Sequence, residues 1–528
     1  MKKPSLLAAL MLLSACNAAE EDLQAEAKST ASAELKDSVR LLVGFKGTPG
    51  AAERAMLRGQ GATIRRELAE LKVIAIEVPA ARAEALARAQ GVEYVEEDLL
   101  RKPQALANAQ LVPSLSNGLY GLVSTRSTDT HARGVIGTGI RIGIADTGLD
   151  YTHPDIAPVY KGGIDTVSDD MDPWWNGDVN ETHGTHVAGT IVGANNTSGV
   201  LGVAYGAELY HARVLGPSGG YSSDIMAGVR YLVETAGCRV VNMSLGGGTK
   251  SRTEETFYNE MRTKGALIVA ATGNDSATRV SYPAAYTSNI GVGAVDVNNA
   301  HASFSNSGTG IDVSGPGVLV LSSVPAGQGS EAEVTSGAGA ARAFGLTFAS
   351  KTSGLSRTLV NCGLGNVGEC PASVSGNIAL IQRGTLSFSD KVLNAMNQGA
   401  VGAILYNNAA GDFMGTLTTE TTSAGKAWIP AVSVSDTAGA ALKAQVGSTV
   451  SLLNQVAAYD HYDGTSMATP HVTGVVALIW SSNPTLSNSQ VESYLTSTAK
   501  DLGTAGFDSI FGYGLVDASA AVKAASGK

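Results

Sequence analysis

Short apolar runs alternate with segments of helical period along most of the chain after residue 121. Examples of the runs are 140–145, 208–214, 240–243 and 267–271. Strands that alternate with helices form parallel sheets that are covered by helices on both faces. We therefore predict a three-layer α/β/α fold with a parallel sheet for this part of the chain.

The N-terminal region has a different pattern, which predicts a small α+β domain with an antiparallel sheet over residues 39–102. Apolar alternation predicts strands at 39–45, 73–78 and 92–95. Helical periodicity predicts helices at 51–58 and 80–90. The polar, alanine-rich stretch 102–110 follows, and we expect it to be an exposed, cleavable linker.

Residues 328–456 interrupt the alternating pattern. This segment is dense in Gly, Ala, Ser and Thr, and the strand-like runs 378–381 and 403–406 flank a predicted helix at 389–398. The α/β pattern resumes afterwards with a long apolar helix at 467–480. We interpret residues 328–456 as an inserted α/β domain.

The first residues have the pattern of a secretory signal. Two lysines precede the apolar run 6–13 and the sequence Ser14-Ala15-Cys16. The ending resembles the bacterial lipobox, which implies lipid modification of Cys16; the alternative is an ordinary buried helix with an incidental cysteine. We therefore predict a signal peptide at 1–16, a tether at 17–38 and export, with the membrane as a partner only through this anchor.

Composition argues against a membrane-spanning protein and against a nucleic-acid-binding protein. The chain has 528 residues, 44% of them hydrophobic, and a formal net charge of −10. No apolar run reaches the ~18 residues of a membrane span, and no long basic run suggests a nucleic-acid partner. Cys362 and Cys370 bracket a glycine-rich loop of seven residues. For an exported chain we predict a disulfide between them, with two unpaired thiols as the alternative.

Three segments carry candidate chemistry. Asp146 ends a buried strand, His183 opens a predicted helix and Ser466 opens another. Taken singly, each residue has an ordinary structural role as a cap or turn residue. His183 and His186 could also form a metal pair, but no HExxH arrangement or third ligand accompanies them.

Taken together, the segments around these residues, in the order Asp, His, Ser, resemble those of the subtilisin-like serine proteases. The resemblance covers about 119–325 and 459–522, within a catalytic domain at 109–528. It implies a seven-stranded parallel α/β/α fold and a catalytic triad of Asp146, His183 and Ser466. Such a triad activates a serine hydroxyl because the imidazole accepts its proton and the carboxylate orients the imidazole.

The resemblance extends to the oxyanion site and to the substrate cleft. Asn274 corresponds to the family's side-chain oxyanion donor, and Ser281 to the floor of the main specificity pocket. No acidic cluster stands out near Ser281, so we expect apolar or broad preference there. Peptide substrates should bind by strand addition between two edges, namely Ser244, Leu245 and Gly246 on one side and Ser218, Gly219 and Gly220 on the other.

A structural calcium site is also implied by the resemblance. The segment 194–200 is similar to a calcium-binding loop of the subtilisins, and the motif 153–155 supplies a carboxylate. A plain turn rich in Asn is the alternative. The expected oxygen ligands are the side chains of Asp155 and Asn196 and the carbonyls of Ala194, Ser198 and Val200.

The accessory regions resemble a subtilisin propeptide at 39–102 and a protease-associated domain at 328–456. The resemblance implies that the propeptide inhibits its own protease, with its C-terminal tail in the cleft. We expect cleavage within 102–110, at the bond Asn108–Ala109. The sequence thus predicts an exported, calcium-binding serine endopeptidase that is made as a zymogen and acts on proteins or peptides. The alternative is a catalytically silent scaffold that binds proteins through the inserted domain.

Overall fold

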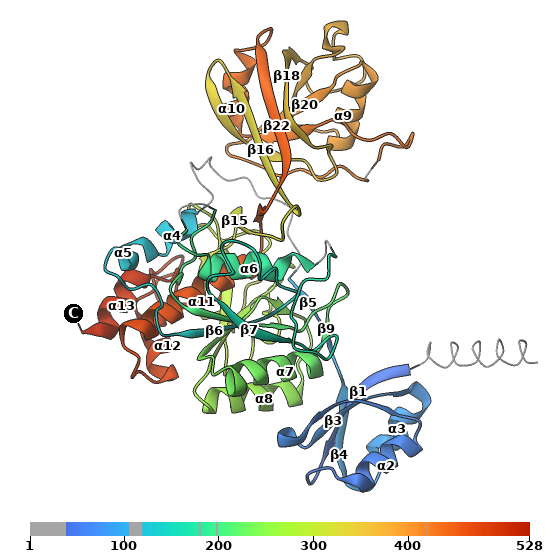
Figure 1. Cartoon of the computed structure of the whole chain (residues 1–528), viewed down its shortest axis with the longest axis vertical. Coiled ribbons are helices and arrows are strands. Elements are labelled where there is room, and N and C mark those ends of the chain that lie inside the picture. Colours follow the sequence, from blue (N-terminus) through green and yellow to red (C-terminus); the bar gives the residue numbers. More distant parts are fainter. Residues whose placement is uncertain (1–37, 105–118, 179–180, 197–198, 420, 528) are drawn as a thin grey trace, which may run out of the picture. The chain divides into compact units, whose positions relative to one another are not determined.

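The computed structural model describes residues 38–104, 119–178, 181–196, 199–419 and 421–527, and it divides into two compact units at Leu99/Leu100 (Figure 1). The first unit is a four-stranded antiparallel sheet in the order β2-β3-β1-β4. Leu57 of one helix and Leu86 of the other are fully buried in its core. Its elements are β1 Ser38–Phe45, α2 Ala51–Gly59, β2 Thr63–Leu68, β3 Val73–Pro79, α3 Ala83–Ala87 and β4 Val92–Glu97.

This unit differs from the sequence prediction in two elements. The sequence pattern did not predict β2, because its polar residues face outward and only Leu68 is fully buried. The helix predicted at 80–90 is shorter, with a 3₁₀ turn at Ala80–Arg82 followed by α3. The chain leaves the helix early because Gly91, at a φ of 87°, turns it into β4.

The second unit contains the predicted parallel sheet. Its seven strands have the order β14-β13-β12-β10-β6-β8-β7, and every neighbouring pair is parallel. Helices α7 and α8 cover one face, and α6 and α11 cover the other (Figure 1). This architecture confirms the predicted three-layer α/β/α fold. The strands are β6 Arg141–Asp146, β7 Tyr160–Asp165, β8 Glu208–Arg213, β10 Val240–Met243, β12 Leu267–Ala271, β13 Ile290–Val295 and β14 Val313–Pro316.

Helix α11 forms the centre of the core of this unit. It is apolar on all sides, and every residue from Thr465 to Trp480 is buried, as expected of a helix with neighbours all round. It contacts the sheet as well as α6, α12 and α13. Ser466 is therefore on one of the most firmly packed elements of the protein. The helices are α4 Tyr120–Ser124, α5 Ser127–His131, α6 His183–Val192, α7 Ser222–Arg230, α8 Arg252–Thr263, α11 Thr465–Ser482, α12 Asn488–Ser497 and α13 Ala518–Ser526.

The prediction of an exposed linker over 102–110 is wrong for the first residues of that range. Residues Leu100–Pro103 form strand β5, which lies between β9 (Gly220–Tyr221) and β11 (Leu245–Gly246) in a separate three-stranded sheet. Gln104, the next residue, is buried. Backbone pairing on both sides makes this segment part of a sheet, in which Arg101 is buried whereas Leu100 and Lys102 are exposed. Residues 105–118, including the predicted bond Asn108–Ala109, lie outside the described residues.

The inserted segment is a closed seven-stranded barrel, in the order β16-β17-β21-β20-β19-β18-β22, with helices α9 and α10. The predicted parallel unit of two strands and a helix is present as β19, α9 and β20. Cys362 and Cys370 are joined by a disulfide. The barrel elements are β16 Gly329–Ser336, β17 Gly339–Gly345, β18 Thr352–Asn361, β19 Ile378–Gln382, α9 Phe388–Asn397, β20 Gly402–Tyr406, β21 Ala431–Val434, α10 Asp436–Lys443 and β22 Thr449–Ala457.

The two ends of the insertion meet at one antiparallel pair of strands. Strand β15 (Val320–Ser323) enters the insertion and β23 (Tyr459–Tyr462) leaves it, with Ser323 opposite Tyr459. The insertion therefore begins and ends at neighbouring backbone positions of the catalytic part.

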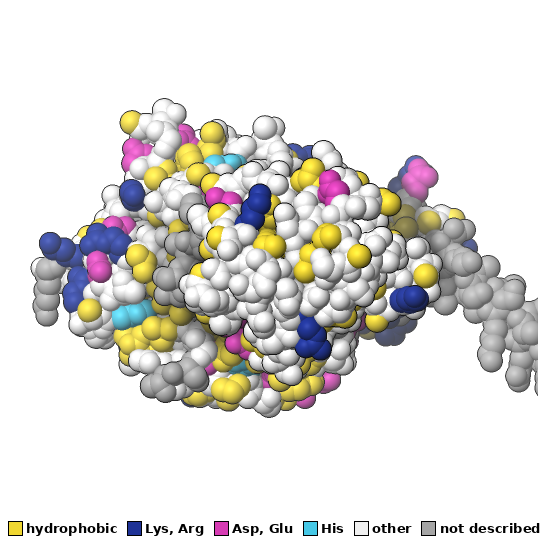
Figure 2. Space-filling view, turned by 90° about the horizontal axis from the view of Figure 1, so that it is seen from above, with side chains coloured by type: hydrophobic (Ala, Val, Ile, Leu, Met, Phe, Trp, Pro, Cys, Tyr) yellow, Lys and Arg dark blue, Asp and Glu magenta, His cyan; other side chains and the backbone are white. Residues whose placement is uncertain are grey.

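The surface carries charges of both signs. On the face in Figure 2, acidic, basic and hydrophobic side chains are interspersed, and no large area of basic side chains gathers there. Among the described residues, no helix is both long and apolar enough to span a membrane.

Candidate active site

Asp146 and His183 meet where β6 ends and α6 begins. Oδ1 of Asp146 lies 2.7 Å from Nδ1 of His183, and both side chains are buried. The same carboxylate oxygen accepts a 2.7 Å hydrogen bond from the backbone N–H of Thr147. The hydroxyl of Thr147 accepts from the N–H of Gly184 and so ties the start of α6 to the end of β6. The carboxylate and the imidazole are thus fixed before any substrate binds.

Ser466 is at the start of α11, and its hydroxyl points to a neighbouring carbonyl. Oγ of Ser466 donates a 3.0 Å hydrogen bond to the carbonyl of Ser244. The hydroxyl of Ser244 donates in return to the carbonyl of Ser466 at 2.8 Å. Nε2 of His183 makes no hydrogen bond within the part of the chain that the structure describes. The Asp–His half of the predicted triad is therefore assembled, and the Ser–His hydrogen bond is not made in this conformation.

Two hydrogen-bond donors converge beside Ser466. A Cβ atom on Gly464 would lie 3.1 Å from Nδ2 of Asn274 and 3.5 Å from the backbone nitrogen of Ser466. The amide of Asn274 is oriented by Thr465, whose N–H and hydroxyl both donate to Oδ1 at 2.9 Å. The N–H groups in the first turn of a helix have no partner within that helix. The space next to Gly464 is thus suited to an oxygen that becomes negatively charged during a reaction.

The predicted substrate edges are the strands on either side of β5. On one side Leu245 pairs with Pro103 and Gly246 with Lys102. On the other side Gly220 pairs with Arg101, whereas Ser218 and Gly219 belong to the preceding turn. A Cβ on Gly246 would lie 2.4 Å from Nε2 of Gln104 and 3.3 Å from Cβ of Ser281. Ser281 therefore lies near the side chain that follows β5.

His186, three residues after His183, has a structural role. Nε2 of His186 lies 3.0 Å from the carbonyl of Val320, and its ring stacks on Tyr462 with the centroids 4.2 Å apart. Burial lowers the pKa of His186 to about 3, so the imidazole is neutral. The described residues contain no group of three or more His, Cys, Asp and Glu side chains that could hold a metal ion.

The predicted calcium ligands surround one buried carboxylate. Oδ1 of Asp155 accepts from Nδ2 of Asn196 at 2.7 Å, and Oδ2 accepts from the N–H of Val200 and the hydroxyl of Ser323, each at 3.1 Å. The N–H of Ala194 donates to the Asp155 carbonyl at 2.9 Å. The structure thus brings four of the five predicted residues together. The fifth, Ser198, lies outside the described residues, as does Cys16.

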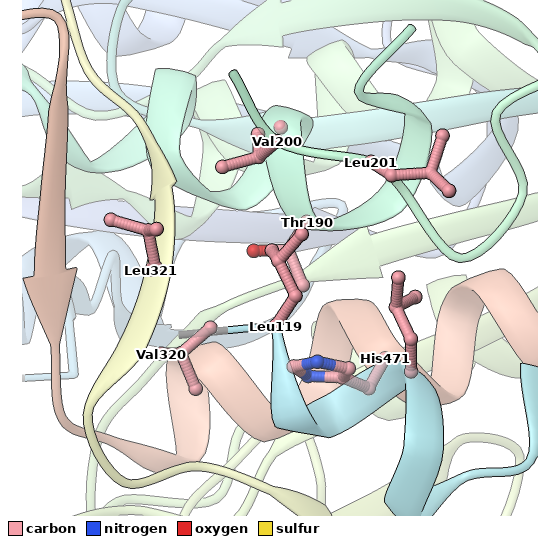
Figure 3. Close-up of a pocket in the computed structure, with 9 residues that line it drawn as sticks. Leu119, Thr190, Val200, Leu201, Val320, Leu321 and His471 are labelled. Atoms are coloured by element: carbon pink, nitrogen blue, oxygen red, sulfur yellow. The ribbon is translucent and has the colours of Figure 1, made fainter. Parts of the chain in front are cut away.

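A small pocket lies apart from Asp146 and Ser466. Figure 3 shows its apolar lining next to Thr190 and His471. Nδ1 of His471 lies 2.8 Å from the carbonyl of Met467, and burial lowers its pKa to about 4. The imidazole is therefore neutral and packed into the scaffold. The apolar residues that line the pocket are Leu119, Leu122, Val200, Leu201, Val320 and Leu321.

Sequence reasoning missed two features of the site. The first is Thr465, which orients Asn274 and lies in the segment already singled out for Ser466. The second is a buried ion pair between Arg101 and Glu254, which no motif indicated. Both residues are almost fully buried although they carry full charges, and this is rare unless the charges are paired.

The fold is that of a serine endopeptidase of the subtilisin type. The sequence matches the model of the Subtilase family over residues 137–352 and 400–514, and the model of the PA domain over residues 313–442. The chain belongs to the Subtilase family and is a subtilisin-like serine endopeptidase with an inserted protease-associated domain.

Individual relatives agree with this assignment. Subtilisin E of Bacillus subtilis is 35% identical over 332 residues, which are 61% of this chain and 81% of the relative. Subtilisin Savinase of Lederbergia lenta is 43% identical over 219 residues, 41% of this chain and 76% of the relative. Among solved structures, the psychrophilic subtilisin-like protease Apa1 of the Antarctic psychrotroph Pseudoalteromonas sp. AS-11 has a TM-score of 0.63 at 33% identity, covering 77% of this chain and 98% of that one.

Proposed function

We propose that the chain is the zymogen of an exported, calcium-binding serine endopeptidase whose catalytic residues are Asp146, His183 and Ser466. The observation that carries this proposal is the 2.7 Å contact between Asp146 and His183. His183 opens helix α6, and α6 packs against α11, whose first turn contains Ser466. The convergence of two N–H donors beside Gly464 supports it independently.

In the proposed mechanism, Ser466 attacks the carbonyl carbon of the scissile peptide bond. Its hydroxyl first rotates away from the Ser244 carbonyl and donates to Nε2 of His183, which accepts the proton as the bond forms. Asp146 holds the imidazole by its Nδ1–H and stabilises the imidazolium. The protonated His183 then gives its proton to the leaving amine, and water releases the acyl group by the same steps.

The carbonyl oxygen becomes negatively charged in the tetrahedral intermediate. Nδ2 of Asn274 and the backbone N–H of Ser466 are the donors that would stabilise it. Because Thr465 fixes the Asn274 amide, this stabilisation needs no reorganisation during the reaction.

Hydrolysis of casein by the purified protein tests the proposal. Ser466→Ala should lower turnover by several orders of magnitude, because no nucleophile remains. Asp146→Asn and His183→Ala should cost similar factors, and their combination should add little because the three act as one unit. Equal casein hydrolysis by the wild type and Ser466→Ala would instead favour the silent scaffold that binds proteins through the barrel.

The N-terminal unit acts, in this proposal, as an inhibitor that the protease cleaves off itself. The pairing of β5 between β9 and β11 supports this role, because a peptide substrate would add to the same two edges. The proposed export, the signal peptide and the lipid on Cys16 rest on the sequence pattern of the first residues.

The calcium proposal rests on oxygen donors around Asp155. The carboxylate of Asp155, the amide oxygen of Asn196 and the carbonyls of Ala194 and Val200 are of the kind that calcium prefers. When bound, the ion would neutralise the buried carboxylate and hold the loop in its native conformation. Asn196 donates from its Nδ2 to Asp155, so coordination of calcium through its amide oxygen requires the amide to turn over.

Thermal inactivation measured with chelator and with millimolar calcium tests this site. A native-state ligand at a hundredfold excess over its dissociation constant stabilises by about 2.7 kcal/mol, and inactivation should slow accordingly. Asp155→Asn should remove the effect of calcium. Equal half-lives with and without calcium in the wild type would contradict the proposal.

A further inference from the structure

The tail segment, Leu100–Gln104, contains β5 and lies between β9 and β11 in a fixed register. Pro103 is opposite Leu245, so the next residue, Gln104, falls opposite Ser244 when the antiparallel register continues. The carbonyl of Ser244 is the group that accepts the hydrogen bond of Ser466. The peptide bond that follows Gln104 is therefore the one brought to the Ser466 hydroxyl. This bond lies inside the expected stretch 102–110, four residues before Asn108–Ala109.

Arg101 is the fourth residue before that bond, and its side chain is buried in contact with the carboxylate of Glu254. Nε and Nη2 of Arg101 contact the two carboxylate oxygens of Glu254 at 3.1 and 2.6 Å. Nη2 also donates to the carbonyl of Thr249 at 2.8 Å. Both charged side chains are only 2% exposed. The contact is thus a bidentate, desolvated ion pair.

The protein itself holds the Glu254 carboxylate in place. The hydroxyl of Tyr286 lies 2.9 Å from Oε2 and 3.0 Å from the Ser251 carbonyl, between which its one proton is shared, and the hydroxyl of Ser222 donates to Oε1. Glu254 is also in the first turn of α8, where a negative charge is favoured by the helix dipole, and its N–H is capped by Ser251. These contacts come from three different segments of the catalytic part and do not involve the tail segment. These contacts therefore hold the carboxylate in the same orientation when Arg101 leaves.

We propose that Glu254 makes the protease selective for arginine at the fourth residue before the scissile bond. An arginine there forms the pair with both carboxylate oxygens and the bond to the Thr249 carbonyl, whereas a lysine has a single nitrogen and cannot match this geometry. An apolar side chain would leave the carboxylate buried without a counter-charge. The expected order is arginine, then lysine, then an apolar residue. This inference rests on the proposed proteolytic function.

The test compares tetrapeptide amides of the sequence of residues 101–104, each with a fluorescent leaving group, as substrates of the mature enzyme. The first residue is arginine, lysine or norleucine. We expect kcat/KM to be at least about tenfold higher for the arginine peptide than for the norleucine peptide, the scale of hydrogen bonds to a charged group. Glu254→Gln should reduce this ratio to below about threefold.

Glu255→Gln is the matched control, because Glu255 is the next residue on α8 but is exposed and pairs with Lys250. For this variant, the ratio of kcat/KM between the arginine and norleucine peptides should equal that of the wild type. Equal kcat/KM values for the arginine and norleucine peptides in a wild-type enzyme that digests casein would overturn the selectivity and leave the proteolytic function intact. Failure of the wild type to cleave casein would overturn both. The wild-type comparison is decisive even if Glu254→Gln does not fold.

Discussion

At the scale of single residues, the proposed oxyanion site depends on Thr465, which orients the amide of Asn274. Thr465 donates twice to Oδ1 of Asn274, and this leaves Nδ2 next to Gly464. Gly464 itself is required, because a side chain there would fill the space between Nδ2 and the N–H of Ser466. In the proposed mechanism, three neighbouring positions of one motif thus supply the nucleophile, the space for the oxyanion and the orientation of its donor.

Asn274→Ala should lower kcat by about 10² to 10³ with little change in KM, because the lost hydrogen bond forms only in the transition state. This magnitude is the one known for such a donor in a subtilisin. Thr465→Val removes one of two bonds to Oδ1 and should lower kcat several-fold, again without raising KM. Steady-state kinetics on a short peptide amide measure both effects, and Thr465→Ser should restore most of the activity. A change confined to KM in either variant would contradict the assigned roles.

The sequence predicted the residues of the site that lie in recognisable motifs, but not those that meet only in the folded chain. Asp146, His183 and Asn274 each follow or precede a strand or helix in a characteristic segment. Arg101 and Glu254 are 153 positions apart and belong to no motif. Their pairing depends on the addition of β5 to β11, and the sequence pattern did not predict β5, whose last two residues belong to the predicted linker 102–110.

At the scale of elements, helices α6 and α11 each carry a buried, neutral histidine. His186 on α6 is held by the Val320 carbonyl and His471 on α11 by the Met467 carbonyl. Burial lowers their pKa values to about 3 and about 4, below the ordinary value of about 6.5. In an unfolded chain both histidines would bind protons below about pH 6.5, whereas in the folded protein they stay neutral until lower pH.

This difference predicts acid sensitivity. The stability that depends on the neutral histidines is fully present above about pH 6.5 and is lost as the pH falls toward 4. Each histidine contributes up to about 1.4 kcal/mol per pH unit in this window. Chemical denaturation of the inactive Ser466→Ala protein between pH 8 and pH 5 measures the slope. His471→Gln should lower the free energy of unfolding at pH 8. It should also reduce the change in that free energy per pH unit by up to the contribution of one histidine. An unchanged slope would contradict this account.

Elements were predictable where burial alone determines the pattern. The central parallel strands are continuous apolar runs, and β10 and β12 have the bounds that the sequence suggested. The barrel was only partly predicted, because strands such as β16 and β18 present many exposed polar residues and resemble loops in the sequence. Their partner strands, β17 and β22, pair with them when the barrel closes, and such long-range pairing leaves no pattern in the local sequence.

At the scale of the whole molecule, the barrel is an insertion between two strands that pair with each other. β15 and β23 pair over four positions, and the N–H of Val324 still donates to the carbonyl of Ala458 at 2.8 Å. A short turn can therefore connect the two strands in place of the barrel. Some packing would be lost, because Phe344 of β17 belongs to the catalytic core cluster and contacts His461 of β23.

Replacement of residues 327–456 by a short glycine-containing turn should leave a folded protease. We expect kcat/KM on a tetrapeptide amide to stay within about tenfold of the wild type, because no residue of the proposed triad or oxyanion site is in the barrel. Parallel assays on casein then show whether the barrel contributes to protein substrates. Loss of peptide hydrolysis by a variant that still unfolds cooperatively would mean that the barrel supports the active site itself.

The order of the parts along the chain also predicts where the enzyme is found. If Cys16 is lipidated, the anchor is on the same side of the cleavage site as the N-terminal unit. Cleavage within 102–110 leaves no covalent link between the catalytic part and the lipid. The precursor should then fractionate with membranes and the mature protease with the soluble fraction, as detected by antibodies to each part. Ser466→Ala cannot cut itself and should remain membrane-bound at full length, whereas Cys16→Ala should release the precursor. A wild-type catalytic part that stays in the membrane fraction after cleavage would contradict this arrangement, because nothing in the proposal would hold it there.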